Sequence, residues 1–574
     1  MKLQGKSAAP GVAVGSIFIH SNYIKQPKET IIPAGEVDSH LNQYLSVKKE
    51  ALKELEKLQL SAGKKDPKKA VIFIAHKEIV EDVIINEEIP AKIKNEHWSG
   101  DWAICQVYET VLSVLKKTPD PLISERASDF EDVRTLLLRL WYGSKNSGLG
   151  NLKEPVIIAA KELLPSDAVN MEKDKVLAIL TETGGLTSHA AIIAKGYGIP
   201  IILGIPGFLE KAKHGQLAVV DANEGIVILD PDSSSVEEYK KKADAFLQDK
   251  KDIETYLDKE CYTACAVKID IGLNISNTDE DLAAAQYADS VGVFRTEFLY
   301  MEKDILPSED EQFIHYSKVL ECFGDRPVII RTMDIGGDKN VPCMTMPRED
   351  NPFLGNRALR LCFSNPGIFT TQIRALLRAA VQGNLWLMLP MVASINDIRK
   401  AKEFISSAAA ELKKEGKPFG KIKIGIMIEI PSIAIMADLA AKEVDFASIG
   451  TNDLCQYLCA ADRMNSEVED YYDPYHPAHI KLIKEVITAF NSEGKPISVC
   501  GEFGSDLMAI PLLIGLGLHK LSMNASAIPA VKRVIAGCIV KDCESLAERV
   551  LACITADEVK AVLLGYSKSR MHDA

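Results

Sequence analysis

TGGLTSHAAIIAKGYGIPIILG, residues 183–204, is the stretch that decides how the first half of the chain folds. Its paired glycines release the backbone, and Thr187 or Ser188 can then cap a helix. The run Ala190 to Lys195 has helical character, further glycines stop it, and a short apolar strand follows. The pattern predicts an α/β domain that holds His189 in the first turn of a helix.

A histidine in that position suits one kind of chemistry. The unpaired N–H groups and the positive dipole end of a helix start favour an anion held on, or attached to, the imidazole. His189 is therefore suited to carrying a phosphoryl group covalently. A short motif leaves a second interpretation open, in which His189 only packs against or caps its helix.

Length, composition and charge limit the class of protein. The 574 residues are too many for one hydrophobic core and suggest about three or four domains. The net charge of -13 argues against nucleic acid as a partner and suits a basic protein partner. The segment MKLQGKSAAPG lacks the apolar core of a signal peptide, and no apolar run approaches the ~18 residues of a membrane span. We therefore expect a cytoplasmic protein without membrane insertion.

Twelve scattered cysteines indicate neither a zinc site nor a disulfide framework.

Three patterns divide the first 260 residues. The segments 1–20 and 145–231 contain short apolar strands and together predict a discontinuous α/β domain. Between them, apolar residues three and four apart predict an inserted bundle of about four helices in residues 21–144. The strongly charged segment 232–260 predicts an exposed linker helix. The expected strands of the α/β domain are Val12 to Ile19, Val156 to Ala159, Val176 to Ile179, Ile201 to Leu203, Leu217 to Val220 and Ile226 to Leu229.

Eight strand candidates, separated by helical stretches, recur within residues 261–574. Eight such units in one segment of this length predict a (β/α)8 TIM barrel, so the fold class is multi-domain α/β. The expected strands are Val267 to Ile275, Gly292 to Arg295, Val328 to Met333, Leu385 to Met391, Ile422 to Glu429, Phe446 to Ile449, Ile497 to Cys500 and Lys520 to Met523.

Polar residues interrupt these strands at their carboxyl ends, where barrel enzymes build their sites. Buried charges cost several kcal/mol each unless they are paired, so a structural explanation for the whole set is poor. Several arginines together indicate a ligand with phosphate and carboxylate groups, and two carboxylates at strand ends suit Mg²⁺. Cys500 is either an ordinary buried thiol or an acid at the barrel mouth. The residues are Arg295, Arg331, Asp334, Glu429, Asn452, Asp453, Cys500 and Glu502, with Arg357 and Arg463 in following loops.

Seven ordered motifs carry a resemblance to a known family. They are GGLTSHAAIIA, VFRTEFLYM, IIRTMDIGGDK, NPFLGNRALR, IGIMIEIPS, FASIGTNDLCQY and SVCGEFGSD. The chain resembles the phosphoenolpyruvate-protein phosphotransferases, the first enzymes (enzyme I) of the bacterial sugar phosphotransferase system. The resemblance runs from PGVAVG near residue 10 to the last strand of the barrel.

The resemblance implies an activity and a role for each site residue. His189 would take the phosphoryl group of phosphoenolpyruvate and pass it to a histidine of the phosphocarrier protein HPr, releasing pyruvate. Residues 21–144 would bind HPr, and the barrel would form a homodimer. Cys500 would protonate the enolate, and Glu429 and Asp453 would bind Mg²⁺. The substrate-binding residues would be Arg295, Arg331, Arg357, Asn452 and Arg463.

Two positions near His189 depart from the family pattern. Leu186 stands where the family usually has arginine, and Ala168 where it usually has threonine. Losing a cation and a hydroxyl there removes hydrogen bonds expected to orient the imidazole or its phosphate. One alternative is therefore a catalytically weakened regulatory relative that binds the carrier.

Two further alternatives come from proteins with similar parts. Dikinases and phosphoenolpyruvate synthases share the phosphohistidine motif and the barrel, but they need a nucleotide-grasp domain for which 574 residues leave no room. A barrel lyase acting on a pyruvate-like substrate would leave the first 230 residues unexplained.

Overall fold

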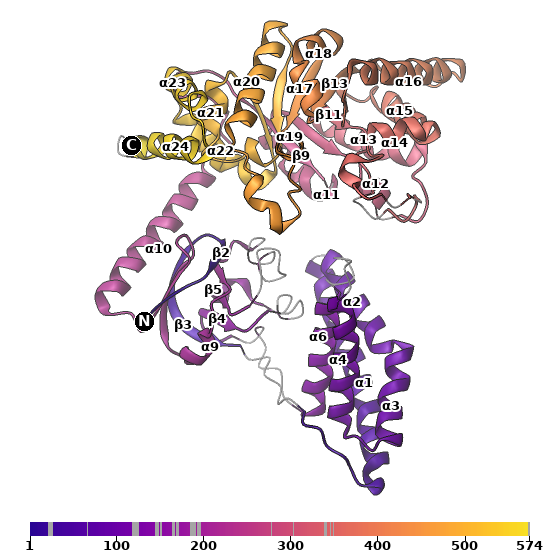
Figure 1. Cartoon of the computed structure of the whole chain (residues 1–574), viewed down its shortest axis with the longest axis vertical. Helices are drawn as coiled ribbons and strands as arrows, with labels where there is room; N and C mark the ends of the chain where they lie inside the picture. Colours follow the sequence, from indigo (N-terminus) through magenta and orange to yellow (C-terminus); the bar gives the residue numbers. More distant parts are fainter. Residues whose placement is uncertain are drawn as a thin grey trace. The chain divides into compact units, whose positions relative to one another are not determined.

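The fold consists of two compact units, residues 1–250 and 251–574 (Figure 1). The computed structural model describes residues 1–20, 27–65, 67–117, 126–143, 149, 152–163, 167, 171–183, 191, 194, 197–276, 278–301, 303–337, 341–344, 346–347 and 349–571.

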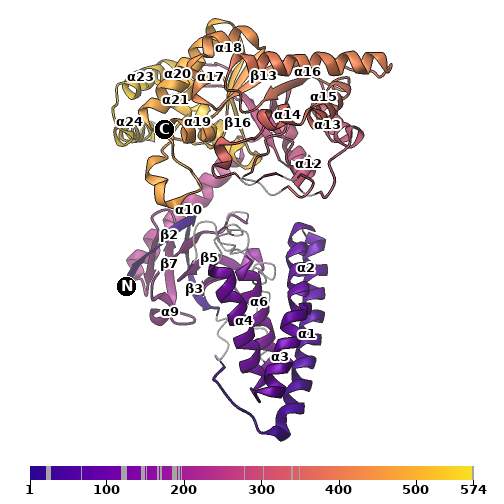
Figure 2. The same ribbon diagram turned by 45° about the vertical axis from the view of Figure 1, so that its right-hand side comes forward.

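The inserted segment forms a helical bundle, whose helices lie side by side in both views (Figures 1 and 2). Tyr44, Ile89 and Tyr108 are among the side chains buried in its own core. Five helices are described where the sequence predicted about four, because Asp82 accepts a hydrogen bond of 3.0 Å from the Ile85 N–H and starts a new helix. The helices are α1 (Val37–Lys65), α2 (Pro67–Glu81), α3 (Val83–Asn95), α4 (Gly100–Lys117) and α6 (Ala127–Trp141).

A mixed sheet forms the rest of the first unit, with the strand order β1-β8-β7-β3-β4-β5-β6-β2. Strand β3, which precedes the bundle in the chain, pairs in parallel with β4, so the two segments flanking the bundle share one sheet as predicted. Apolar cores cover both faces. The strands are β1 (Lys2–Gln4), β2 (Lys6–Ala9), β3 (Val12–Ile19), β4 (Val156–Ala160), β5 (Val176–Thr181), β6 (Ile201–Leu203), β7 (Leu217–Asp221) and β8 (Ile226–Leu229), with the short helix α9 (Phe208–Lys211).

Helix α10 (Ser233–Glu254) lies in the predicted linker segment. All of its residues are described and none is buried, in keeping with its high charge. It ends six residues before the predicted Glu260, because backbone turns replace the helix from Thr255 onward. Within the described part of the chain, no helix combines the length and apolarity that crossing a membrane requires.

The second unit is a closed barrel of eight parallel strands, and all eight strands were predicted from the sequence. Side chains alternate along each strand: one set packs outward against the helices, and the other, which includes Trp386, Met427 and Cys500, packs inside the barrel. The strands are β9 (Asp270–Ile275), β10 (Ser290–Arg295), β11 (Val328–Arg331), β12 (Leu385–Leu389), β13 (Lys423–Ile428), β14 (Phe446–Gly450), β15 (Ile497–Cys500) and β16 (Lys520–Met523).

Helices surround the barrel strands on the outside (Figure 1). They are α11 (Thr278–Asp281), α12 (Phe298–Met301), α13 (Glu309–Phe323), α14 (Leu359–Ser364), α15 (Pro366–Ala379), α16 (Ile395–Lys414), α17 (Pro431–Ile435), α18 (Ala437–Glu443), α19 (Thr451–Cys459), α20 (Pro477–Ser492), α21 (Ile510–Gly515), α22 (Ile528–Ala536), α23 (Val540–Leu551) and α24 (Ala556–Met571).

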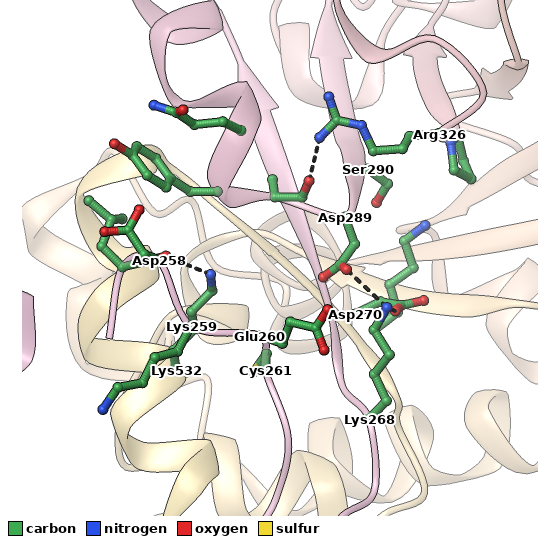
Figure 3. Close-up of a pocket in the computed structure, with 16 residues that line it drawn as sticks. Asp258, Lys259, Glu260, Cys261, Lys268, Asp270, Asp289, Ser290, Arg326 and Lys532 are labelled. Atoms are coloured by element: carbon green, nitrogen blue, oxygen red, sulfur yellow. Dashed lines mark hydrogen bonds and ion pairs between the residues drawn. The ribbon is translucent and has the colours of Figure 1, made fainter. Parts of the chain in front are cut away.

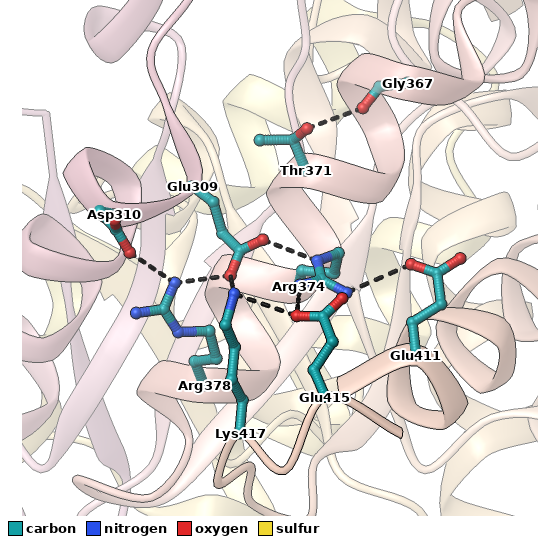
Figure 4. A network of polar contacts seen from close by, with 9 residues as sticks. All are labelled: Glu309, Asp310, Gly367, Thr371, Arg374, Arg378, Glu411, Glu415 and Lys417. Atoms are coloured by element: carbon teal, nitrogen blue, oxygen red, sulfur yellow. Dashed lines mark hydrogen bonds and ion pairs between the residues drawn. The ribbon is translucent and has the colours of Figure 1, made fainter. Parts of the chain in front are cut away.

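An ion-pair network joins three of these helices on the outer wall of the barrel (Figure 4). The Arg374 guanidinium on α15 binds Glu309 at the start of α13 at 2.6 Å, Glu411 on α16 at 3.2 Å and Glu415 just beyond α16 at 2.7 Å. Arg378 also binds Glu309, at 2.5 Å. Since networks of charges hold geometry better than isolated surface pairs, this cluster fixes the spacing of the three helices.

Candidate active site

A cavity of about 370 Å³ opens at the carboxyl ends of the barrel strands. The structure brings together there all eight barrel residues for which the sequence analysis predicted a role. These residues are Arg295, Arg331, Arg357, Glu429, Asn452, Asp453, Arg463 and Cys500. Their convergence is a property of the fold, while the role of each stays a prediction.

The strand register places these side chains. Arg295 and Arg331 are the last residues of β10 and β11 and pair directly across the two strands. Cys500 ends β15 opposite Gly450 at the end of β14. Asn452 and Asp453 follow at once in the first turn of α19, so the same edge of the barrel presents them all.

Two carboxylates hold the buried arginines in place. Arg331 is 8% exposed and forms ion pairs with Glu297 and, at 3.0 Å, with Asp334. Asp334 also binds the Arg357 guanidinium at 3.0 Å. The four side chains therefore form one continuous chain of charges, in which each guanidinium has its orientation fixed by a carboxylate. A further contact of 3.4 Å joins Arg357 to the Tyr457 hydroxyl.

Glu297 is a site residue that the sequence analysis did not single out. It is 5% exposed, and its Oε2 atom has no hydrogen-bond partner among the described residues. Its position two residues after Arg295, in the motif VFRTEFLYM, was the one available signal. The contact with Arg331 joins residues 34 positions apart and could not be read from spacing.

The electrostatics of the cavity keep Arg331 charged. Burial alone would lower the pKa of Arg331, but the carboxylates of Glu297 and Asp334 outweigh this effect and raise it. The cavity therefore keeps fixed positive charge at any pH at which the protein is folded, which suits an anionic ligand.

Glu429 and Asp453 provide carboxylate oxygens that fit a divalent cation. Glu429 is fully buried, and its Oε1 accepts a hydrogen bond of 2.5 Å from the Met391 N–H. Its Oε2 and the Asp453 Oδ1 accept no hydrogen bond from the described residues. Gly450 leaves room beside them, because a Cβ added there would lie 3.1 Å from Glu429 Oε2. Asp453 is only partly buried, and its Oδ1 forms a long ion pair of 3.8 Å with Arg463. Two carboxylates whose oxygens accept no hydrogen bond suit Mg²⁺, which takes few protein ligands.

The pKa of Glu429 is raised by its burial beside other carboxylates. Burial, followed by the nearby charges of Asp453 and Asp334, raises the pKa of Glu429 to about 8. A bound cation would favour the ionised form and lower it, so the raised value belongs to the metal-free site.

Cys500 is 4% exposed, and its Sγ donates to the Ile449 carbonyl at 3.6 Å. Burial raises the pKa of Cys500 to about 11, with Ser448 and Arg331 acting in the opposite direction. The thiol therefore stays protonated near neutral pH and can donate a proton. Gly501 follows with φ +127°, and a Cβ there would lie 2.5 Å from Thr451 Oγ1, so only glycine fits this turn.

Two strained residues lie next to residues that line the cavity. Ala358 and Met391 have φ angles of 51° and 54°, which residues other than glycine seldom adopt. The Ala358 N–H is held by the Ile335 carbonyl at 2.8 Å, and the Met391 N–H by Glu429. Strain of this kind fixes Arg357 and the Glu429 carboxylate in position at the expense of local stability.

His189, Leu186 and Ala168 lie outside the described residues, and so does most of the segment around them. Ala191 and Ala194, which are described, are helical and fully buried, in agreement with the predicted helix. Asp167, next to Ala168, is hydrogen-bonded to His20 at 2.9 Å.

Comparison with known families identifies the class of protein. Models described as "PEP-utilising enzyme, N-terminal", "PEP-utilising enzyme, mobile domain" and "PEP-utilising enzyme, PEP-binding domain" match residues 4–126, 152–225 and 250–539. The last alone spans half of the chain and covers most of the barrel. The fold is thus that of a phosphoenolpyruvate-utilising enzyme.

Relatives narrow this class to one family. Two relatives are the phosphoenolpyruvate-protein phosphotransferases of Staphylococcus carnosus (strain TM300) and Staphylococcus aureus. Each is 38% identical to this chain, the first over 577 residues and the second over 576. Each alignment covers 99% of this chain and 99% of the relative. That of Priestia megaterium is 38% identical over 577 residues, covering 100% of this chain and 99% of the relative. The chain belongs to the phosphoenolpyruvate-protein phosphotransferase family.

Proposed function

We propose that the protein transfers the phosphoryl group of phosphoenolpyruvate to His189 and from there to a histidine of the phosphocarrier HPr, releasing pyruvate. One observation carries the proposal: four arginines, two carboxylates with oxygens that accept no hydrogen bond from the described residues, and a protonated thiol line one cavity in a chain that belongs to this family. No reaction with fewer steps uses all of these groups.

Phosphoryl transfer depends on positioning and on neutralising charge. Arg331 and Arg357, locked by Glu297 and Asp334, would hold the phosphate and carboxylate groups together with Arg295, Asn452 and Arg463. The bond between phosphorus and the enol oxygen breaks as a bond to the His189 imidazole forms. The electron pair of the broken bond stays on the enolate, and Cys500 delivers a proton to its carbon to give pyruvate.

Glu429 and Asp453 would hold Mg²⁺, since Glu429 Oε2 and Asp453 Oδ1 accept no hydrogen bond from the described residues and the Asp453–Arg463 ion pair is long, at 3.8 Å. A bound Mg²⁺ stabilises negative charge on phosphate and enolate oxygens. Once Glu429 is ionised, both carboxylates place negative charge where it repels the substrate unless a cation is present.

We further propose that the helical bundle binds HPr, that the barrel forms a homodimer and that the protein acts in the cytoplasm. Exposed apolar side chains supply possible contact surfaces: Ile84 is 70% exposed at α3, and Ile435 is 71% exposed at the end of α17. Sedimentation of the whole chain with Mg²⁺ and phosphoenolpyruvate measures the dimer, and a monomeric mass at tens of micromolar would count against it.

Labelled phosphoenolpyruvate tests the proposed activity. With Mg²⁺ present, we expect an acid-labile, base-stable phosphoryl group on His189 that moves to HPr when HPr is added. His189→Ala removes this label, while His214→Ala, which replaces an exposed histidine in the same sheet domain, keeps it. Label retained in His189→Ala would overturn the assignment.

A catalytically weakened regulatory relative is the second candidate, and the departures Leu186 and Ala168 favour it. Such a protein would bind HPr and phosphoenolpyruvate but transfer label far more slowly than a relative with the usual arginine and threonine. Single-turnover transfer rates separate the two candidates.

A further inference from the structure

A second cavity, of about 550 Å³, lies at the amino-terminal end of the barrel (Figure 3). Asp270, Ser290 and Lys520, the first residues of β9, β10 and β16, line it, and these strands are neighbours in the order β16-β9-β10. None of its lining residues belongs to the cavity at the carboxyl ends. The two cavities are therefore separate sites on one barrel.

Positive charge in this cavity is only partly neutralised. Lys268 is paired with Asp289 at 3.1 Å and with Asp270 at 3.6 Å. Arg326 instead donates to the carbonyls of Ala285 and Ala288 at 2.6 and 2.8 Å, which satisfies its hydrogen bonds but not its charge. The lining holds five basic side chains, Lys259, Lys268, Arg326, Lys520 and Lys532, and four acidic ones, Asp258, Glu260, Asp270 and Asp289.

Lys532 and Lys520 also lack a carboxylate partner among the described residues. Lys532 is 6% exposed and donates to the Leu257 carbonyl at 2.8 Å. Lys520 has no ion pair or hydrogen bond within the described part of the chain, and its Nζ lies 5.4 Å from the centre of the Trp386 ring. Burial lowers the pKa of Lys520; the charges of Asp270 and Asp289 only partly oppose this, and Lys423 adds to it. Lys520 is partly exposed and its ammonium lies over the Trp386 ring, whereas Lys532 is buried. Cations withdrawn from water without a counter-charge are costly, and a bound anion would relieve the cost.

Ser290 gives an independent indication of a ligand. Its side chain is 1% exposed, and its Oγ has no hydrogen-bond partner among the described residues. Buried hydroxyl groups almost always have a partner. A ligand atom in the cavity would supply one.

We propose that this cavity binds the phosphate group of a small metabolite, with Lys520 supplying charge and Ser290 a hydrogen bond. A phosphate fits better than a carboxylate, because lysines recognise phosphate as point charges whereas a carboxylate favours the planar fork of an arginine. The fork of Arg326 is already filled by backbone carbonyls. The site goes beyond the proposed transfer reaction and needs neither phosphoenolpyruvate nor His189.

Trp386 does not itself line the cavity but reports on it through Lys520, whose Nζ lies 5.4 Å from the centre of its ring. It is the single tryptophan in residues 251–574. The full chain labelled with 5-fluorotryptophan is titrated with inorganic phosphate at constant ionic strength, and Trp386→Phe assigns the ¹⁹F resonance. We expect a saturable shift of the Trp386 resonance. Lys520→Gln should weaken phosphate binding by about tenfold or more, and Lys520→Arg should restore part of it.

Two controls keep the result specific. Arg463→Ala disrupts the other cavity and should leave the Trp386 titration unchanged. Ser290→Ala removes a hydroxyl that lacks a protein partner, so the melting temperature without phosphate should not fall, while phosphate affinity drops several-fold. The proposal is overturned if the resonance does not shift saturably, if Lys520→Gln binds phosphate as the parent does, or if Ser290→Ala lowers stability and leaves affinity intact.

Discussion

Replacing Glu297 tests whether the buried charge chain positions the substrate arginines. In Glu297→Ala, Arg331 keeps only Asp334, which it already shares with Arg357. Removing one partner of a buried ion pair destabilises a protein by about 3–5 kcal/mol when the remaining charge is left uncompensated. Arg331 keeps a share of Asp334, so we expect the lower end of this range. Glu297 and Arg331 are 5% and 8% exposed, so this estimate applies without a discount for solvent.

The effect on activity follows from geometry. A guanidinium released from its carboxylate loses its fixed orientation, and a displacement of about 1 Å at a reacting group can cost on the order of 100-fold in rate. We therefore expect kcat for pyruvate formation to fall by about 100-fold. Phosphoenolpyruvate should restore part of the lost stability, since its negative charge takes the place of the missing carboxylate.

Thermal unfolding with and without phosphoenolpyruvate, together with steady-state kinetics, measures both effects. Glu311→Ala is the matched control: Glu311 pairs with Lys303 at 41% exposure, so its loss should cost about 0–1 kcal/mol and leave kcat unchanged. If Glu297→Ala is no less stable than Glu311→Ala and keeps normal kcat, Glu297 does not hold Arg331 for catalysis.

Three further predictions concern protons and the phosphohistidine. Because a pKa of about 11 keeps the Cys500 thiol protonated, kcat should not fall between pH 7 and 9 through loss of this acid, and a pH–rate profile falling with a midpoint near 9 would contradict it. Mg²⁺ needs ionised Glu429, whose metal-free pKa is about 8. Mg²⁺ affinity measured by calorimetry should therefore rise with pH and level off above a pH of about 8, and binding below that pH should release a proton. Leu186→Arg combined with Ala168→Thr should speed transfer from phosphoenolpyruvate to His189 about tenfold or more in rapid-quench experiments, since a charge-assisted hydrogen bond is worth roughly 1.5–3 kcal/mol; an unchanged rate would show that other residues compensate.

The barrel strands could be predicted because each is a short apolar run and several of them end in a polar residue. Arg295, Glu429 and Cys500 mark three of those ends, and each lines the cavity. A chain with parallel strands must bring their carboxyl ends to one edge, so convergence follows from strand direction alone. Strand order and register were not needed for that conclusion.

Contacts between distant residues could not be predicted in the same way. The Glu297–Arg331 pair depends on the register of β10 and β11, which sequence spacing does not encode. The edge strands β1 and β2 are three and four residues long, too short for a period of two to be recognised. The extra bundle helix depends on whether Asp82 caps a helix or remains within one, and only the packed structure decides this.

The charges in the carboxyl-end cavity indicate why substrate and metal should bind together. Four arginines face four carboxylates there, Glu297, Asp334, Glu429 and Asp453, so the fully ionised cavity is neutral. Because Glu429 holds a proton at pH 7 in the metal-free protein, the empty cavity carries a charge of about one positive unit. Mg²⁺ binding ionises Glu429 and makes the cavity neutral, so phosphoenolpyruvate with about three negative charges and Mg²⁺ with two positive ones together leave about one negative charge. Phosphoenolpyruvate alone leaves about two negative charges, and Mg²⁺ alone leaves about two positive charges. Each ligand should therefore raise the affinity for the other, and we expect the cavity to favour the magnesium complex of the substrate over the free anion.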